Sequence, residues 1–242
     1  MGSTPPTSSP KNDRRKRSQL VKAGLRRPHR IPSYLLNRIS ASRPVSFDFA
    51  DVVSGFRVDA AALPHFSARF TAEVQLLNMA LKDAHAKCSL EIGCGYGRLS
   101  PWIALHSDQH FAIDLNQEFI SVARQLYPSI QFRDASAQHL PFADKSFDLV
   151  VTWTVLQHLP GSGLREATEE IKRVATSDAV LIVTEGVGEY HTKGYWEHTM
   201  EEWKEFFNPW QLVWSTERKI ELTYKGYAGE VMRFEKPHGT SS

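Results

Sequence analysis

Three glycines at alternate positions carry the clearest chemical signal in this sequence of 242 residues. Gly93, Gly95 and Gly97 follow Glu91 in the segment Glu-Ile-Gly-Cys-Gly-Tyr-Gly, directly after the short strand predicted over residues 88–92. Because glycine lacks a Cβ atom, such a segment can turn sharply and let a ligand approach its backbone closely. A turn of this kind between a strand and a helix predicts a site where backbone N–H groups bind a small-molecule cofactor.

The spacing of the glycines argues against two common nucleotide sites. The dinucleotide fingerprint needs a glycine at its sixth position, but that position is Arg98 when counted from Gly93. Counted from Gly95, it is Ser100. A phosphate-binding P-loop needs Gly-Lys-Ser/Thr, whereas Gly97 is followed by Arg98. The turn therefore predicts neither a nicotinamide site nor a nucleoside triphosphate site.

Acidic and small polar residues follow the second and third predicted strands. Asp114 ends the second strand, where a carboxylate can accept hydrogen bonds from both ribose hydroxyls of a nucleoside. The alternative is that Asp114 caps the helix predicted over 117–126. Asp134, Ala135 and Ser136 follow the third strand, where a plain turn is the alternative to a binding role.

Three ionisable residues follow the fourth and fifth predicted strands, namely His158, Glu185 and His191. Because the carboxyl ends of parallel strands meet at one edge of a sheet, we expect these side chains near the ligand. Each is a candidate general base that takes a proton from a hydroxyl or amine group. For His158, packing or contact with the cofactor is the alternative. His191 and His198 lack the spacing of ligands on one helix face, so no metal site is predicted.

Strand and helix patterns alternate through the middle of the chain. Strands are predicted over 88–92, 110–114, 130–134, 147–153 and 179–184, and helices over 63–84, 98–105, 117–126 and 163–174. This alternation requires a parallel sheet with helices on both faces. A helix over 200–207 and strands over 210–220 and 229–234, with a turn over 224–226, complete the pattern. The predicted fold is α/β, a doubly wound and mostly parallel seven-stranded sheet with an antiparallel carboxyl-terminal edge.

The motif Glu-x-Gly-x-Gly-x-Gly resembles the first motif of the class I S-adenosylmethionine-dependent methyltransferases, particularly the small-molecule type related to the ubiquinone-biosynthesis enzymes. The resemblance covers about residues 65–185 and includes the later segments 140–148 and 152–159. It implies a Rossmann-like fold and S-adenosyl-L-methionine as the cofactor. The cofactor-binding residues that it implies are Glu91, Gly93, Cys94, Gly95, Gly97, Asp114, Leu115, Asp134, Ala135, Ser136 and Thr152.

The resemblance implies transfer of a methyl group to an oxygen or nitrogen atom of a small-molecule acceptor. Two alternatives remain open: a nucleic-acid or protein methyltransferase, and a non-catalytic cofactor-binding module. The fourth strand ends in Thr152 and Trp153 and is followed by Thr154 and Val155. The Asn/Asp-Pro-Pro-Tyr/Phe motif, which is typical of enzymes that methylate the amino groups of nucleic-acid bases, is missing at this position. The sequence names neither the acceptor nor the oligomeric state.

Charge divides the chain into two parts. Residues 1–45 hold 11 of the 29 Lys and Arg residues and one of the 27 acidic residues, so the remainder is acidic. The composition predicts a disordered basic tail over 1–19, a helical cap over 20–62 and the methyltransferase domain over 63–237. The basic segment 11–30 is a candidate contact for nucleic acid.

Cysteine content and hydropathy indicate the compartment. Cys88 and Cys94 stand too close together for a disulfide framework or a zinc-ligand pattern. No apolar run reaches the roughly 20 residues that a membrane-spanning helix needs. We therefore expect a cytoplasmic protein without a membrane partner.

Overall fold

The structure is a computed structural model that describes residues 63–192, 194–218 and 229–236. The expected basic tail, its segment 11–30, the expected cap and the turn over 224–226 lie outside the described residues. Within the described ranges, no helix combines the length and the apolar character needed to cross a bilayer.

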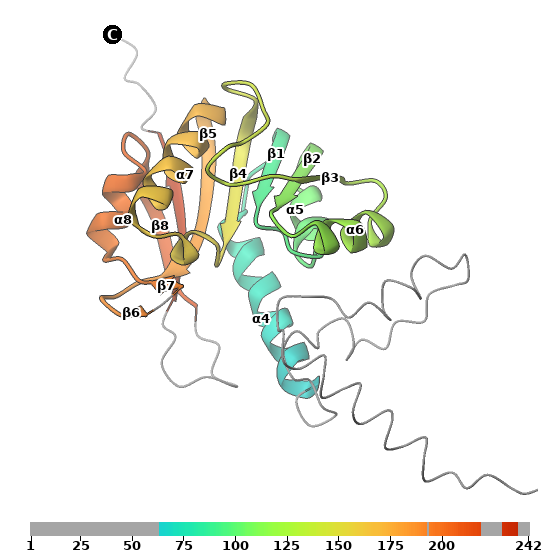
Figure 1. Ribbon diagram of the computed structural model, residues 1–242, viewed down its shortest axis with the longest axis horizontal. Helices are drawn as coiled ribbons and strands as arrows, with labels where there is room; N and C mark the ends of the chain where they lie inside the picture. Colours follow the sequence, from blue (N-terminus) through green and yellow to red (C-terminus); the bar gives the residue numbers. More distant parts are fainter. Residues whose placement is uncertain (1–62, 193, 219–228, 237–242) are drawn as a thin grey trace, which may run out of the picture. The chain divides into compact units, whose positions relative to one another are not determined.

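One seven-stranded sheet organises the described chain (Figure 1). Its strands are β1 (Ala86–Ile92), β2 (Ser107–Asp114), β3 (Gln131–Asp134), β4 (Phe147–Trp153), β5 (Ala175–Gly186), β8 (Gln211–Glu217) and β9 (Gly229–Glu235). In space their order is β3-β2-β1-β4-β5-β9-β8. Strands β1 to β5 run parallel, whereas β9 runs antiparallel to both β5 and β8. The expected mostly parallel sheet with an antiparallel carboxyl-terminal edge is confirmed.

Helices cover both faces of this sheet. They are α4 (Leu63–Ala80), α5 (Ser100–Ala104), α6 (Gln117–Leu126), α7 (Gly161–Val174) and α8 (Met200–Phe206). Leu77 of α4 and Val151 of β4 belong to one buried apolar cluster, and Leu164 of α7 and Val150 of β4 belong to another. Because successive strand residues point to opposite faces, the central strand is buried on both sides, as a doubly wound fold requires.

The first residue of α6 is set by an asparagine. Asn116 is the N-cap, and its side-chain oxygen accepts hydrogen bonds from the backbone N–H groups of Glu118 and Phe119. This contact satisfies two donors that the first helical turn leaves without an internal partner. Because Asn116 is the N-cap of α6, Asp114, two positions earlier, is not the cap.

Most element bounds agree with the sequence-based expectations. Strand β4 and helix α6 have the predicted bounds, and α4 ends at Ala80 rather than at residue 84. Strand β5 is longer than predicted because it begins at Ala175 and continues to Gly186. The sequence did not predict the short hairpin of β6 (His191–Thr192) and β7 (Tyr195–Trp196), nor the 3-10 turn η1 (Leu156–His158).

Candidate functional site

The predicted glycine turn lies at the carboxyl end of β1, between β2 and β4. The strand order reverses at this point, since β2 and β3 lie to one side of β1 and β4 and β5 to the other. Such a reversal is where open α/β sheets bind their ligands. The first five strands therefore bring the predicted residues to a common edge, called here the carboxyl edge.

All three glycines of the turn have positive φ angles, of 75° at Gly93, 56° at Gly95 and 83° at Gly97. A Cβ atom at Gly93 would lie 2.2 Å from a methyl group of Val155, so the backbone there is packed against the chain that follows β4. A Cβ atom at Gly95 would meet no atom of the described residues within 4 Å. Gly95 is therefore the glycine over which a ligand can lie against the backbone.

The Asp114 carboxylate lies beside this open glycine. It accepts hydrogen bonds from the backbone N–H of Gly95 at 2.8 Å and from the backbone N–H of Asn116 at 2.8 Å. Burial raises the pKa of Asp114, and the two backbone hydrogen bonds act in the opposite direction. Each carboxylate oxygen uses one of its lone pairs in these contacts, which leaves capacity for further donors. Since Asn116 caps α6, the alternative role of Asp114 as the helix cap is wrong.

Glu91 and Cys94 lie beneath the turn. Glu91 is buried, and its carboxylate accepts a hydrogen bond from the hydroxyl of Ser100 at the start of α5. The backbone N–H of Cys94 donates to the carbonyl of Ile113 at 2.9 Å, and burial raises the pKa of its thiol. Both residues thus hold the turn against its neighbours.

The residues after β2 and β3 form the more exposed part of the edge. Leu115 is exposed, and the Asp134 side chain is 49% exposed and accepts a hydrogen bond from Gln117 Nε2 at 3.1 Å. The backbone N–H of Ala135 already donates to the carbonyl of Asp114 at 3.1 Å. The Ser136 hydroxyl accepts from a backbone N–H within its own turn. Asp134 is consequently the group of this turn that is most available to a ligand.

Glu185, a predicted general base, is instead the centre of a buried hydrogen-bond network. Its side chain is fully buried at the end of β5, and its carboxylate accepts from the backbone N–H groups of Val155, Leu156 and Gln157 at 3.1 to 3.2 Å. The hydroxyl of Thr152 is a fourth donor, at 3.2 Å. Burial raises the pKa of Glu185 to about 7, against the opposing effect of these four donors.

This network changes the interpretation of two predicted site residues. Because all four donors converge on one carboxylate, Glu185 holds the chain after β4 in place and is closed to a substrate proton. The Thr152 hydroxyl is likewise directed at Glu185, so the structure gives it no open contact with a cofactor. The sequence missed this arrangement because it joins segments from two different strands.

The two candidate histidines lie on segments next to this network. His158 ends η1, is exposed, and its Nδ1 lies 2.8 Å from the carbonyl oxygen of Gly194. Since a carbonyl can only accept, Nδ1 must carry the proton, and the lone pair of Nε2 faces the amide nitrogen of Gln157 at 3.4 Å. His191 is exposed on β6, and its ring centroid lies 6.3 Å from that of His198. The described residues contain no group of His, Cys, Asp or Glu side chains suited to a metal ion.

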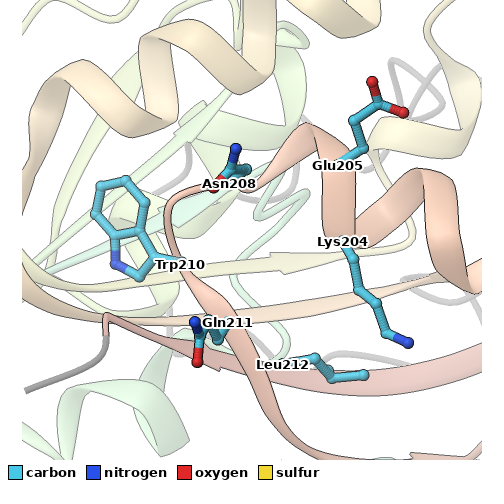
Figure 2. A pocket seen from close by; sticks show the side chains of 6 residues that line it. All are labelled: Lys204, Glu205, Asn208, Trp210, Gln211 and Leu212. Atoms are coloured by element: carbon cyan, nitrogen blue, oxygen red, sulfur yellow. The ribbon is translucent and has the colours of Figure 1, made fainter.

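A surface hollow elsewhere on the molecule lies away from these residues. The hollow has a volume of about 430 Å³. Figure 2 shows the side chains that line it, those of Lys204, Glu205, Asn208, Trp210, Gln211 and Leu212. Trp210 donates a hydrogen bond to the carbonyl of Ala179, near the amino end of β5. The hollow therefore lies toward the edge of the sheet opposite the glycine turn.

Comparison with known proteins shows what the central segment is similar to. Residues 90–183 match the family model described as methyltransferase domain. A probable S-adenosylmethionine-dependent methyltransferase of Mycobacterium tuberculosis is 31% identical over 99 residues, which cover 41% of this chain and 35% of that protein. The match thus spans about a third of the length of this curated relative.

Two solved structures have the same fold. The N-methyltransferase NodS of Bradyrhizobium japonicum, in complex with S-adenosyl-L-homocysteine, superposes with a TM-score of 0.59 at 19% identity, over 86% of this chain and 99% of that chain. The 1,6-didemethyltoxoflavin-N1-methyltransferase of Burkholderia thailandensis gives a TM-score of 0.59 at 18% identity, over 82% of this chain and 94% of that chain. That structure holds 1,6-didemethyltoxoflavin and S-adenosylhomocysteine.

Proposed function

We propose that this chain, which contains a class I S-adenosylmethionine-dependent methyltransferase domain, transfers a methyl group to an oxygen or nitrogen atom of a small molecule. The observation that carries the proposal is the pairing of Asp114 with the open glycine of the turn. The carboxylate and the uncovered backbone of Gly95 fit the ribose of the cofactor and the chain attached to it. The acceptor class is supported by a methyltransferase of the same fold that holds the small molecule 1,6-didemethyltoxoflavin, and by an N-methyltransferase of the same fold.

The proposed cofactor contacts follow from the geometry of the carboxyl edge. Asp114 would accept hydrogen bonds from the ribose hydroxyls, and Asp134 would accept one from the adenine ring. Gly93 and Gly97 keep the turn in its left-handed conformation, while Glu91 and Cys94 fix it from beneath. When bound, the sulfonium of S-adenosylmethionine supplies an electrophilic methyl carbon.

The chain's own part in the reaction is to position the acceptor, exclude water and receive a proton. An in-line displacement needs nucleophile, methyl carbon and leaving group on one axis, so orientation contributes much of the rate. A hydroxyl or ammonium acceptor must also lose a proton, and His158 Nε2 is the proposed base, with His191 as the second candidate. Glu185 is assigned the role of positioning the segment from which His158 projects.

Calorimetry on the full chain tests the proposal. We expect S-adenosylhomocysteine to bind with a micromolar dissociation constant, while NAD and ATP do not bind. Transfer of a labelled methyl group to a panel of small amines and phenols then tests the acceptor class. Binding of NAD without binding of S-adenosylhomocysteine would contradict the assignment, and labelling of RNA or protein alone would exclude a small-molecule acceptor.

A further inference from the structure

The short hairpin formed by β6 and β7 lies beside the proposed base His158 and has no part in the proposed cofactor contacts. It follows the carboxyl end of β5 (Figure 1), and β7 contacts the 3-10 turn η1, which ends at His158. The ring centroids of His158 and Tyr195 lie 6.0 Å apart in an edge arrangement. The hairpin therefore forms part of the surroundings of the His158 imidazole.

One ring nitrogen of His158 contacts the turn of the hairpin. The carbonyl oxygen of Gly194 lies 2.8 Å from Nδ1. A carbonyl is an acceptor only, so this contact requires a proton on Nδ1. A neutral imidazole that is free in water favours the other tautomer, in which Nε2 carries the proton. The contact with Gly194 thus selects the less common tautomer.

The other ring nitrogen of His158 faces the side chain of Gln157. Gln157 is buried, and its amide oxygen accepts a hydrogen bond from the backbone N–H of Gly186 at 2.7 Å. Since that N–H group can only donate, the amide nitrogen is the end that points to His158, 3.4 Å from Nε2. An amide nitrogen also donates only, so this contact requires an unprotonated Nε2. Two independent contacts therefore specify the same tautomer.

This tautomer is the form that a general base at Nε2 needs, because its lone pair can receive a proton. The contact between Gln157 and Nε2, at 3.4 Å, is longer than the distances of about 2.7 to 3.2 Å at which N–H groups bind oxygen acceptors. His158 is exposed, so the hydroxyl or ammonium group of an acceptor can replace this long contact. With the proton on Nε2 instead, the ring would have no lone pair at that atom.

The hairpin is held together by the buried carboxylate of Glu197, directly after β7. Its Oε2 accepts a hydrogen bond from the backbone N–H of Tyr190 at 3.1 Å, and its Oε1 accepts one from the hydroxyl of Tyr195 at 3.3 Å. The backbone N–H of Glu197 also donates to the carbonyl of Tyr190 at 2.9 Å. Glu197 thus joins the two ends of the hairpin and binds the side chain of the residue next to Gly194.

Two glycines leave room for these polar side chains, Gly186 at the end of β5 and Gly188 after it. A Cβ atom at Gly186 would lie 2.5 Å from the hydroxyl of Tyr195 and 3.1 Å from Cγ of Glu197. A Cβ atom at Gly188 would overlap the carboxylate of Glu197. The hairpin is therefore packed against the chain that leaves β5, and Gly186 lies beside both the hairpin and Gln157.

We propose that Gln157 and Glu197 are positioning residues that hold His158 in the neutral tautomer with its proton on Nδ1. Gln157 acts directly on Nε2, and Glu197 acts through the hairpin turn that contacts Nδ1. The inference rests on the proposed methyltransferase function, in which His158 Nε2 takes the proton of the acceptor. The tautomer is a property of the folded chain, so it can be measured without cofactor or acceptor.

The test is nuclear magnetic resonance of the full chain with nitrogen-15 in its histidine rings, at pH 8, where an ordinary histidine is neutral. The spectrum shows which ring nitrogen carries the proton, and the H158Q variant identifies the signal of His158 by its loss. We expect a proton on Nδ1 in the wild type. The E197A variant removes the acceptor of Tyr190 and Tyr195, so Nε2–H should become the main form. The E197Q variant keeps an acceptor oxygen and should retain most of the wild-type tautomer.

The Q157E variant reverses the polarity of the second contact. One carboxylate oxygen can still accept from Gly186, and the other places an acceptor opposite Nε2 of His158, so Nε2 should carry a proton. Methyl transfer to the acceptors found among small amines and phenols should then fall by about a hundredfold, with the affinity for S-adenosylhomocysteine within about twofold of the wild type. The E189A variant removes an exposed carboxylate just before the hairpin and should behave as the wild type.

The Y195F variant covers the case in which E197A or Q157E does not fold. It removes only the hydroxyl that binds Glu197 and keeps the ring, and it should raise the fraction of Nε2–H. A proton on Nε2 in the wild type would overturn the inference, and so would a wild-type tautomer in the folded Y195F and E197A proteins. Failure of the wild type to bind S-adenosylhomocysteine would contradict the proposed function, while the spectra recorded without that ligand still test the inference.

Discussion

The polar groups in the two halves of the carboxyl edge differ in exposure and in the number of hydrogen bonds that they accept. In the half formed by β1, β2 and β3, the Asp114 carboxylate accepts two backbone N–H groups, and the Asp134 side chain is 49% exposed. In the half formed by β4, β5, β9 and β8, Glu185 is fully buried with four donors, and Arg218 is buried beside Glu73. In the first half, carboxylate oxygens remain available to a ligand. In the second half, the carboxylate of Glu185 accepts its hydrogen bonds from the protein itself.

This difference shows that acidic residues at the carboxyl ends of two strands can have different roles. Asp114 and Glu185 both stand at the carboxyl end of a parallel strand, and the sequence assigned both to the site. Each Asp114 oxygen accepts from one donor and keeps a lone pair at a partly exposed position, whereas the carboxylate of Glu185 is fully buried and accepts from three donors on Oε1 and one on Oε2. Glu185 organises the chain after β4, so we expect its loss to damage the fold before it damages binding.

The largest effect is expected from the E185A variant. It leaves the N–H groups of Val155, Leu156 and Gln157 and the Thr152 hydroxyl without their acceptor in the interior. At about 1 to 3 kcal/mol for each unmet donor, the free energy of unfolding should fall by about 4 kcal/mol or more. Urea unfolding at pH 7.5 measures the change.

The D134A variant, which removes an acidic group from the open half, is the matched control and should lose less than about 0.5 kcal/mol. An E185A variant as stable as the wild type, but without methyl transfer, would reverse the comparison and return Glu185 to the catalytic role.

The second prediction is that the free energy of unfolding depends on pH through Glu185, in the half formed by β4, β5, β9 and β8. Burial raises the pKa of Glu185 from an ordinary value of 4.5 to about 7, so the folded state binds the proton more tightly than the unfolded state. The contribution of this group to stability is therefore complete below pH 4.5 and falls as the pH rises to about 7. The total loss is about 3 kcal/mol.

Unfolding free energies of the wild type and of the E185Q variant at several pH values between 4.5 and 8 measure this dependence. The difference between the two proteins should decline across that range, because glutamine does not titrate. A difference that stays constant with pH would mean that the four donors keep Glu185 ionised throughout.

The sequence predicted the open half of the edge well for a physical reason. Gly93 to Gly97 and Asp114 belong to one strand-turn-helix-strand unit, so their types and spacing determine the local backbone. The bounds of β4 and α6 also agreed, because a continuous apolar run and an amphipathic period are local signals.

The buried half was not predictable in the same way. The contacts of Glu73 with Arg98 and Arg218 join residues far apart in the chain, and on the sequence Glu73 is one acidic residue of an ordinary helix. The β6 and β7 strands have two residues each, which is too short to show a period. Only the tertiary fold shows that Glu73, Arg98 and Arg218 lie together.

The third prediction concerns the open half and uses the D114A variant. Removing this carboxylate takes away the proposed acceptor of the ribose hydroxyls, and charge-assisted hydrogen bonds contribute about 1.5 to 3 kcal/mol. The affinity for S-adenosylhomocysteine should fall by about tenfold or more, as measured by calorimetry. The D108A variant removes an exposed carboxylate at the start of β2 and should bind as the wild type does. Unchanged affinity in a folded D114A protein would refute the ribose contact.

The last prediction concerns the G95A variant, whose expected loss of stability is small and which separates fold from binding most cleanly. Gly95 has φ of 56° and no described atom within 4 Å of its Cβ position, so alanine costs about 1 kcal/mol of backbone strain alone. In G97A the new Cβ atom would also lie 3.0 Å from the rings of Phe132 and Tyr127, so the loss of stability should be greater. The affinity for S-adenosylhomocysteine should show the reverse order, with a greater loss in G95A than in G97A. The reason is that only the Cβ atom at position 95 enters the open space where a ligand lies against the backbone. Melting temperatures and dissociation constants measured on the same preparations decide this, and a G95A protein with wild-type affinity would show that the cofactor does not lie over Gly95.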